Sequence, residues 1–381
     1  MAVAPSPATV RRRRDDLVRR AHRADDPLGV FAAASTTLRD LVPFDAAVWL
    51  TTDPLTGLPT APTRVDDLGD VTPEMCSEHW HHEFVVDDVL LFRDLARAER
   101  PAGALRSMVR DPRASARYRT FLQPRGFEDE LRALLRVGDA PWGSLSLWRR
   151  DASKPFTRKE TALLAGLAAP LGEALRGCAR VAQLLGEPLV ADEPGMMLFD
   201  GAAQLVSVNE QARAWLDDAP PDVAVPTDLG IEVPMWLYIV VQRARGVMHG
   251  VGDGTARARI RNRRGVWMMC HASSLWDADG CIHNTAVVLE PAKPAEIAPI
   301  VVEAYDLSPR EQQITRLIVR GLGTADMASE LHLSRHTVRD HVKVIFQKVG
   351  VSRRGELVAK LFAQHYEPAH LRGVVRHEQA G

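Results

Sequence analysis

The sequence predicts a multidomain chain in which two α+β modules are followed by an all-α domain of four helices. Its 381 residues exceed the usual size of one compact domain, so two or three domains are expected. Strand-like alternation and hairpin turns occur up to residue 291, whereas residues 304–366 show helical spacing interrupted by glycines. The proline-rich stretch PAKPAEIAP between the two regions is typical of a semi-rigid linker.

Residues 1–26 are predicted to form an N-terminal tail and helix, and residues 27–180 the first α+β module. The expected elements of this module, in chain order, are a helix at 27–42, strands at 45–51 and 58–65, a largely helical section at 73–121, strands at 129–137 and 142–149, and a helix at 157–178. In the last strand, Trp and Ser alternate with Gly and Leu. This period of two predicts that only one face of the strand is buried.

Residues 189–291 are predicted to form the second module. Its expected elements are strands at 195–200 and 205–208, a helix at 210–216 capped by Asn209, a helix at 234–245, and strands at 256–261, 265–276 and 281–290. The sequence Asp-Ala-Asp-Gly at 277–280 predicts a hairpin turn between the last two strands. Residues 292–303 are the predicted linker, and residues 367–381 are a C-terminal tail.

The stretch from Leu307 to Phe362 carries strong helix signals. The Ser308 side chain can accept from the backbone N–H of Glu311, and the Glu311 carboxylate can accept from the N–H of Ser308. Glycines end this first helix, and Ser334 is a good N-cap for a longer one. The positions expected to face the core are Ile314, Leu317, Ile318, Met327, Ala328, Leu331, Val338, Val342, Ile345 and Val349. A short helix, a tight turn and a longer helix with a basic outer face indicate a helix-turn-helix.

Five motifs at fixed spacing support that interpretation: L-S-P-R-E at 307–311, R-G-L at 320–322, M-A-x-x-L at 327–331, L-S-x-x-T-V-R-x-H-V at 333–342 and K-V-G-V-x-x-R-x-E-L-V at 348–358. The segment resembles the DNA-binding domain of the LuxR/FixJ/GerE-type transcription regulators, and we place it at residues 304–366. Two positions depart from the family pattern. Gly323 stands where the family usually has a capping Ser, and Asp340 is an acid on the expected reading face.

The resemblance implies that the third helix of this domain reads bases with Arg339, Asp340 and Lys343, which lie one turn apart. Phosphate contacts are expected from the first turn of the helix, and Lys348 completes the predicted DNA-binding set. The first-turn residues are Ser334, Arg335 and Thr337. A homodimer on double-stranded DNA is expected, with the fourth helix pairing two copies through Leu357, Val358 and Leu361.

The order helix, hairpin, helical excursion, hairpin, helix in the first module resembles that of GAF domains. The strand pair and Asn-capped helix that open the second module resemble a PAS domain. Both resemblances imply a sensor fold that holds a small-molecule effector, whose identity the sequence leaves open. The predicted function is therefore a DNA-binding transcription regulator controlled through its N-terminal modules.

Charge is unevenly placed along the chain. Residues 308–365 contain ten Lys or Arg and five Asp or Glu, a net charge of +5, whereas the whole chain carries −1, which leaves −6 for the remainder. A basic end on an acidic body suggests that the end alone meets a polyanion. The longest apolar run is interrupted by Gly, Pro and Glu, and no signal peptide is recognised, so we expect a cytoplasmic protein without membrane contact.

Other functional classes find little support in the sequence. The four cysteines form no CxxC pair, so neither a disulfide framework nor a zinc finger is expected. His79, His82 and Glu83 could share a helix face and bind zinc, but a polar face at the edge of a pocket is the favoured interpretation. No cofactor, metal or enzymatic activity is predicted. One alternative stays open, a small-molecule-binding adaptor whose helix-turn-helix makes protein contacts, which would lack the steep salt dependence of DNA binding.

Overall fold

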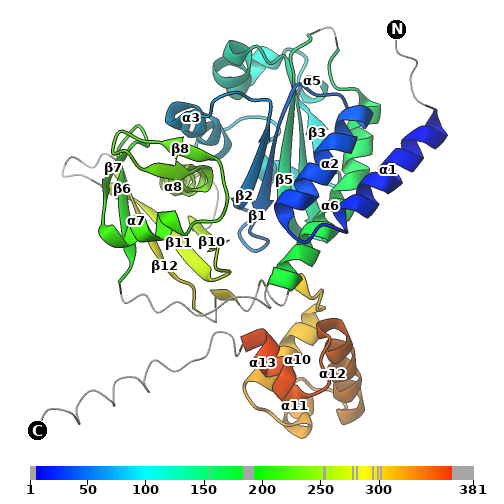
Figure 1. Ribbon diagram of the computed structural model, residues 1–381. Coiled ribbons are helices and arrows are strands. Elements are labelled where there is room, and N and C mark those ends of the chain that lie inside the picture. The colour runs from blue at the N-terminus through cyan, green and yellow to red at the C-terminus, as the bar shows by residue number, and fades with distance from the viewer. Residues whose placement is uncertain are drawn as a thin grey trace, which may run out of the picture.

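A computed structural model describes residues 6–152, 154–182, 193–251, 255–276, 279, 282–293, 296–297, 300 and 303–362 (Figure 1). Two sheet-containing modules form the upper body of the molecule, and a small helical domain lies beneath them. The predicted tail at 367–381 and most of the predicted linker lie outside the described residues. None of the described helices is both long enough and apolar enough to span a bilayer.

The first module contains an antiparallel five-stranded sheet in the order β2-β1-β5-β4-β3. Its strands are β1 (Ala46–Thr52), β2 (Pro59–Asp66), β3 (Ala102–Ala104), β4 (Asp129–Val137) and β5 (Ala140–Arg149). Helices α1 (Pro7–Ala21), α2 (Pro27–Leu41) and α6 (Arg158–Ala182) pack on one face, and α3 (Pro73–Phe84) packs on the other. The prediction of a half-exposed strand at 142–149 was therefore wrong. Nearly every residue of β5 is buried because helices cover both faces of the sheet.

The section at 73–121 is helical only in part. It contains α3, α4 (Phe92–Arg97), α5 (Leu105–Met108) and a short helical turn at Pro112–Ala114, and two further turns, Tyr118–Leu122 and Gln123–Arg125, extend past its predicted end. Between α4 and α5 lies the edge strand β3, which the sequence analysis did not predict. Its three residues, Ala-Gly-Ala, are too few and too small to show strand periodicity.

The second module contains another antiparallel five-stranded sheet, in the order β10-β11-β12-β6-β7. Its strands are β6 (Gly195–Phe199), β7 (Leu205–Val208), β10 (Arg257–Arg261), β11 (Trp267–Trp276) and β12 (Ile282–Pro291). Numbered within each module, both sheets have the strand order 2-1-5-4-3. The helices α7 (Glu210–Asp217) and α8 (Met235–Met248) were predicted, but the small hairpin of β8 (Ala224–Pro226) and β9 (Glu232–Pro234) was not.

Helix α8 joins the two modules into one body. It packs on the second sheet and also against α3 and β2 of the first module, and most of its side chains are buried. Gly246 allows this close approach, since a Cβ there would lie 2.1 Å from the carbonyl oxygen of Phe84. A salt bridge of 2.7 Å between Arg259 and Asp53 adds a second link. One continuous apolar core therefore spans both sheets.

The C-terminal domain contains the four predicted helices, α10 (Pro309–Val319), α11 (Thr324–Glu330), α12 (Arg335–Val349) and α13 (Arg354–Phe362). The capping box is present. The Glu311 N–H donates to Ser308 Oγ at 3.3 Å, and the Ser308 N–H donates to Glu311 Oε2 at 2.8 Å. The core of the domain is made by the apolar faces of all four helices, together with Tyr305 and Ile297.

Candidate nucleic-acid interface

The turn between α11 and α12 is held by contacts from the flanking helices. His332 adopts a left-handed φ of 53°, and Arg310 donates to the Leu331 carbonyl at 2.9 Å. Ser334 caps α12 by accepting from the Thr337 N–H at 3.0 Å, as predicted. Arg354 of α13 donates to Leu322 O and Thr324 Oγ1, at the start of α11. These bonds fix the angle between the two helices of the motif.

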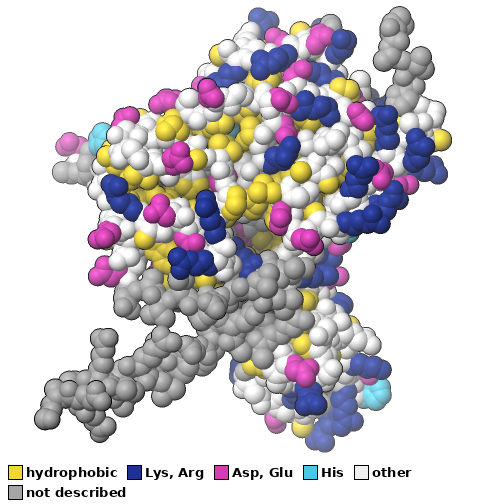
Figure 2. Space-filling view, in the orientation of Figure 1, with side chains coloured by type: hydrophobic (Ala, Val, Ile, Leu, Met, Phe, Trp, Pro, Cys, Tyr) yellow, Lys and Arg dark blue, Asp and Glu magenta, His cyan; other side chains and the backbone are white. Residues whose placement is uncertain are grey.

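Helix α12 divides into a buried stripe and a charged outer face. Val338, Ile345 and Val349 are buried in the domain core. The outer face is exposed and carries Arg335, Arg339, Asp340 and Lys343. Figure 2 shows Lys and Arg side chains gathered on this side of the C-terminal domain. The helix is therefore anchored on one side and presents cations to solvent on the other.

Asp340 does not stand alone on that face. Its carboxylate lies 2.9 Å from Nδ1 of His336, one turn earlier, and both side chains are largely exposed.

Lys348 differs from the other predicted contacts. Its ammonium group donates to Glu311 Oε2 at 2.8 Å and to the Asp306 carbonyl at 2.7 Å. Its hydrogen bonds thus tie α12 to the start of α10 within the domain. These bonds stabilise the fold, and the DNA contact of Lys348 stays a prediction.

Two further expectations change in the same domain. Leu357, expected to pair two copies, is fully buried in the core of its own domain, so it cannot also lie at a dimer surface. Gly323, which lacks a capping side chain, is compensated in part because its N–H donates to Asp326 Oδ2 at 3.2 Å.

The first module holds a buried ionic network that the sequence analysis missed. Arg132 bonds to Glu83 at 2.6 Å and to Glu130 at 2.8 Å, and Arg117 lies 2.9 Å from Glu130. Burial alone would raise the pKa of Glu130, but the two guanidinium groups outweigh burial and lower it. The signal in the sequence was the charged residues within the otherwise apolar strand at 129–137.

The histidine cluster of α3 is not the polar surface that we expected. His79, His82 and Glu83 are all buried, Glu83 in the ionic network and His82 against Thr120 Oγ1 at 2.6 Å. His79 lines a small cavity of about 20 Å³ with Trp80, and burial holds its pKa well below the ordinary value. Among the described residues, no three His, Cys, Asp or Glu side chains are placed to hold a metal ion.

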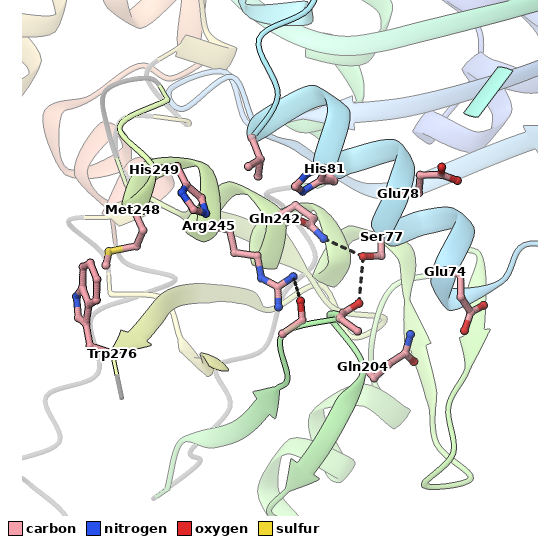
Figure 3. Close-up of a pocket in the computed structure, with 13 residues that line it drawn as sticks. Glu74, Ser77, Glu78, His81, Gln204, Gln242, Arg245, Met248, His249 and Trp276 are labelled. Atoms are coloured by element: carbon pink, nitrogen blue, oxygen red, sulfur yellow. Dashed lines mark hydrogen bonds between the residues drawn. The ribbon is translucent and has the colours of Figure 1, made fainter. Parts of the chain in front are cut away.

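A larger groove of about 700 Å³ is lined by α3, α8 and the turn between β6 and β7 (Figure 3). Gln242 of α8 donates to Ser77 of α3 at 2.9 Å, and Ser77 donates to the Ala202 carbonyl at 3.3 Å. Arg245 donates to the backbone oxygens of Asp200 and Gly201. The bonds of Ser77 join the two modules, whereas those of Arg245 lie within the second module.

The arrangement of α11 and α12 defines the helix-turn-helix class of protein. Residues 306–361 match the family described as bacterial regulatory proteins, luxR family. The chain is 40% identical over 55 residues to the spore germination protein GerE of Bacillus subtilis (strain 168), an alignment that covers 14% of this chain and 74% of that protein. The chain therefore belongs to the LuxR family through its C-terminal domain.

Solved structures similar to the chain include LuxR-type regulators. Escherichia coli SdiA is 13% identical with a TM-score of 0.33, covering 93% of this chain and 98% of that chain. A Vibrio VqmA–ligand–DNA complex is 15% identical with a TM-score of 0.25, covering 48% of this chain and 89% of that chain. Both TM-scores are below 0.5, so neither likeness extends to the arrangement of the whole molecule.

Proposed function

We propose that this protein is a sequence-specific DNA-binding transcription regulator whose activity is controlled by a small molecule through its N-terminal modules. The observation that carries the proposal is the exposed cationic face of α12, opposite a stripe that is buried in the domain core. A helix held in this way can enter a major groove without disturbing the fold behind it. We place the protein in the cytoplasm.

Each exposed side chain of α12 has a proposed role. Arg339 and Lys343 contact guanine, the most common specific contact of these side chains. Asp340 accepts from a cytosine amino group. Phosphate groups of the backbone are held at the first turn by Ser334, Arg335 and Thr337, supported by the helix N-terminus.

The N-terminal modules are proposed to be a GAF-like domain at residues 27–180 and a PAS-like domain at 189–291. The shared strand order of the two sheets supports this assignment, since both modules are then variants of one sensor architecture. Binding to DNA as a homodimer is part of the proposal. The dimer surface lies outside Leu357, which the domain core occupies.

Selection from a random duplex library with the full-length chain tests the proposed function. We expect one enriched sequence with two related half-sites, and a binding constant that falls steeply as salt rises from low to moderate concentration. Sedimentation of the protein with the selected duplex should give two chains per duplex. Enrichment of no sequence, or binding that does not depend on salt, would instead favour the adaptor function.

A further inference from the structure

A second cavity, of about 440 Å³, lies where both modules meet the start of the C-terminal domain. The first module contributes Thr52 of β1 and Leu175 of α6, and the second contributes Arg261 at the end of β10. Ile300, which precedes the C-terminal domain, also lines it. This cavity is distinct from the groove of Figure 3 and from the small cavity beside His79.

Arg261 is a cation without a counterion at this cavity. Its Nε donates to the Gly265 carbonyl at 2.8 Å, and its guanidinium lies 5.9 Å from the centre of the Trp267 ring. Burial lowers the pKa of Arg261 to about 10. In the described part of the chain no carboxylate pairs with it, whereas its neighbour Arg259 has Asp53 at 2.7 Å. A half-buried charge without a partner is unfavourable, and a bound anion would stabilise it.

Other residues of the cavity wall keep hydrogen-bond donors without partners. The Thr52 hydroxyl and the Trp142 indole N–H are buried, and neither meets an acceptor among the described residues. The same holds for Nε of Arg259. Buried donors are rarely left unpaired in a folded protein, so their concentration at one cavity points to an acceptor-rich ligand.

The acidic residues of the cavity are already engaged or exposed. Asp53 is paired with Arg259, and Asp26 accepts from the Gly29 N–H at 2.8 Å as the cap of α2. Asp25 is exposed to solvent. The remaining wall is largely apolar and includes the rings of Trp142 and Trp267. The site therefore combines the part-buried cation Arg261, the exposed guanidinium of Arg263, several unpaired donors and aromatic surfaces.

We propose that this cavity binds a small organic anion, with its carboxylate against Arg261 and an aromatic or aliphatic body against Trp142 and Trp267. The proposal deepens the proposed function, because it assigns the site and chemical class of the controlling molecule. Ile300 packs in the core of the first module, and Trp267 contacts both that core and the core of the C-terminal domain. A ligand in the cavity thereby changes how the C-terminal domain packs against the first module.

Calorimetric titration of the full-length chain with naphthoate and with neutral naphthamide tests the site. We expect saturable binding of naphthoate and about tenfold weaker binding of naphthamide, as for loss of a charge-assisted hydrogen bond. Arg261→Gln should weaken naphthoate binding by about tenfold. Arg261→Lys, which keeps the charge, should weaken it less. Arg257→Gln is the matched control, because Arg257 is exposed at the other end of β10 and does not line the cavity.

Three results would overturn the site: no binding of naphthoate to the unaltered chain, equal binding of naphthamide, or unchanged binding by a folded Arg261→Gln variant. Circular dichroism establishes that the variant is folded, and Arg261→Lys decides the matter if it is not. Titration of DNA with and without naphthoate then tests the coupling, and an unchanged DNA affinity would refute it. Calorimetry needs no DNA. A chain that bound no duplex would therefore refute the proposed function, whereas the naphthoate titration would still test the binding site.

Discussion

Lys348 of α12 and Glu311 of α10 form a salt bridge in which Nζ lies 2.8 Å from Oε2. The same carboxylate oxygen accepts from the Ser308 N–H, so one group closes the capping box and joins two helices. The family resemblance placed Lys348 among the DNA contacts. Its geometry shows that this basic residue of the motif also stabilises the domain.

Lys348→Met should destabilise the C-terminal domain by about 1–3 kcal/mol, because it leaves the buried Glu311 carboxylate without its cation. All eight tryptophans precede residue 291, and Trp267 contacts the core of the first module as well as this domain, so fluorescence does not report on this domain alone. Hydrogen exchange of peptides covering α10 and α12 is the suitable measurement. Lys343→Met is the control, since Lys343 is exposed and its loss should leave exchange unchanged. Equal exchange in the two variants would contradict a structural role for Lys348.

The Glu311 carboxylate should make the domain sensitive to acid. Burial alone would raise its pKa, but the hydrogen bonds from Lys348 and Ser308 outweigh burial and hold the pKa below the ordinary 4.5. A lowered pKa in the folded state stabilises the fold fully above the unfolded-state pKa, and that stabilisation is lost as pH falls through the folded-state pKa. The difference in exchange protection between the unaltered chain and Glu311→Gln should therefore be largest at neutral pH and shrink below pH 4.5. A difference that did not vary with pH would exclude this linkage.

The end of α6 should hold the C-terminal domain against the body. Arg176 bonds to Asp306 at 2.9 Å, and Arg180 donates to the Ala304 carbonyl. Because Asp306 is mostly exposed, its salt bridge alone contributes at most about 1 kcal/mol. A chain that carries both Arg176→Gln and Arg180→Gln should show faster hydrogen exchange at residues 303–307. Hydrogen exchange of peptides from both sheets should stay unchanged. Arg158→Gln with Lys159→Gln, at the opposite end of α6, is the control pair.

Asp340 should weaken binding to DNA of any sequence and increase the discrimination between sequences. Asp340→Ala removes an acid that repels phosphate, so affinity for unrelated duplex should rise at low salt. Discrimination at one base pair of the selected site should fall by about 1–3 kcal/mol. Glu330→Ala removes the same charge from α11 and should alter neither specificity nor half-site preference. Retained discrimination by Asp340→Ala would show that Asp340 reads no base.

Local signals predicted the structure where they were self-contained. The capping box at Ser308 and the N-cap at Ser334 each fix a boundary within a few residues, and the long helices and strands were predicted from such local patterns. Strands β11 and β12 pair antiparallel, but most of the predicted hairpin turn at 277–280 lies outside the described residues. The sequence could not show that helices cover both faces of β5 or that α8 lies between two sheets, because these depend on distant segments. The same limit applies to Lys348 and Leu357. Their partners are set by tertiary packing, although the motif places them correctly on their helices.

The most direct test compares two double variants. One carries both Arg339→Ala and Lys343→Ala, and its matched control carries both Arg316→Ala and Arg320→Ala. Both double variants lose two positive charges, but Arg316 and Arg320 lie on or just after α10 and not on the outer face of α12. Binding to the selected duplex is measured by titration at fixed salt. Base contacts are worth about 1–3 kcal/mol each, so the α12 variant should bind at least about thirtyfold more weakly and lose its preference for the selected sequence. The α10 variant should keep that preference. Equal affinity and equal preference in the two variants would contradict the account that α12 reads DNA.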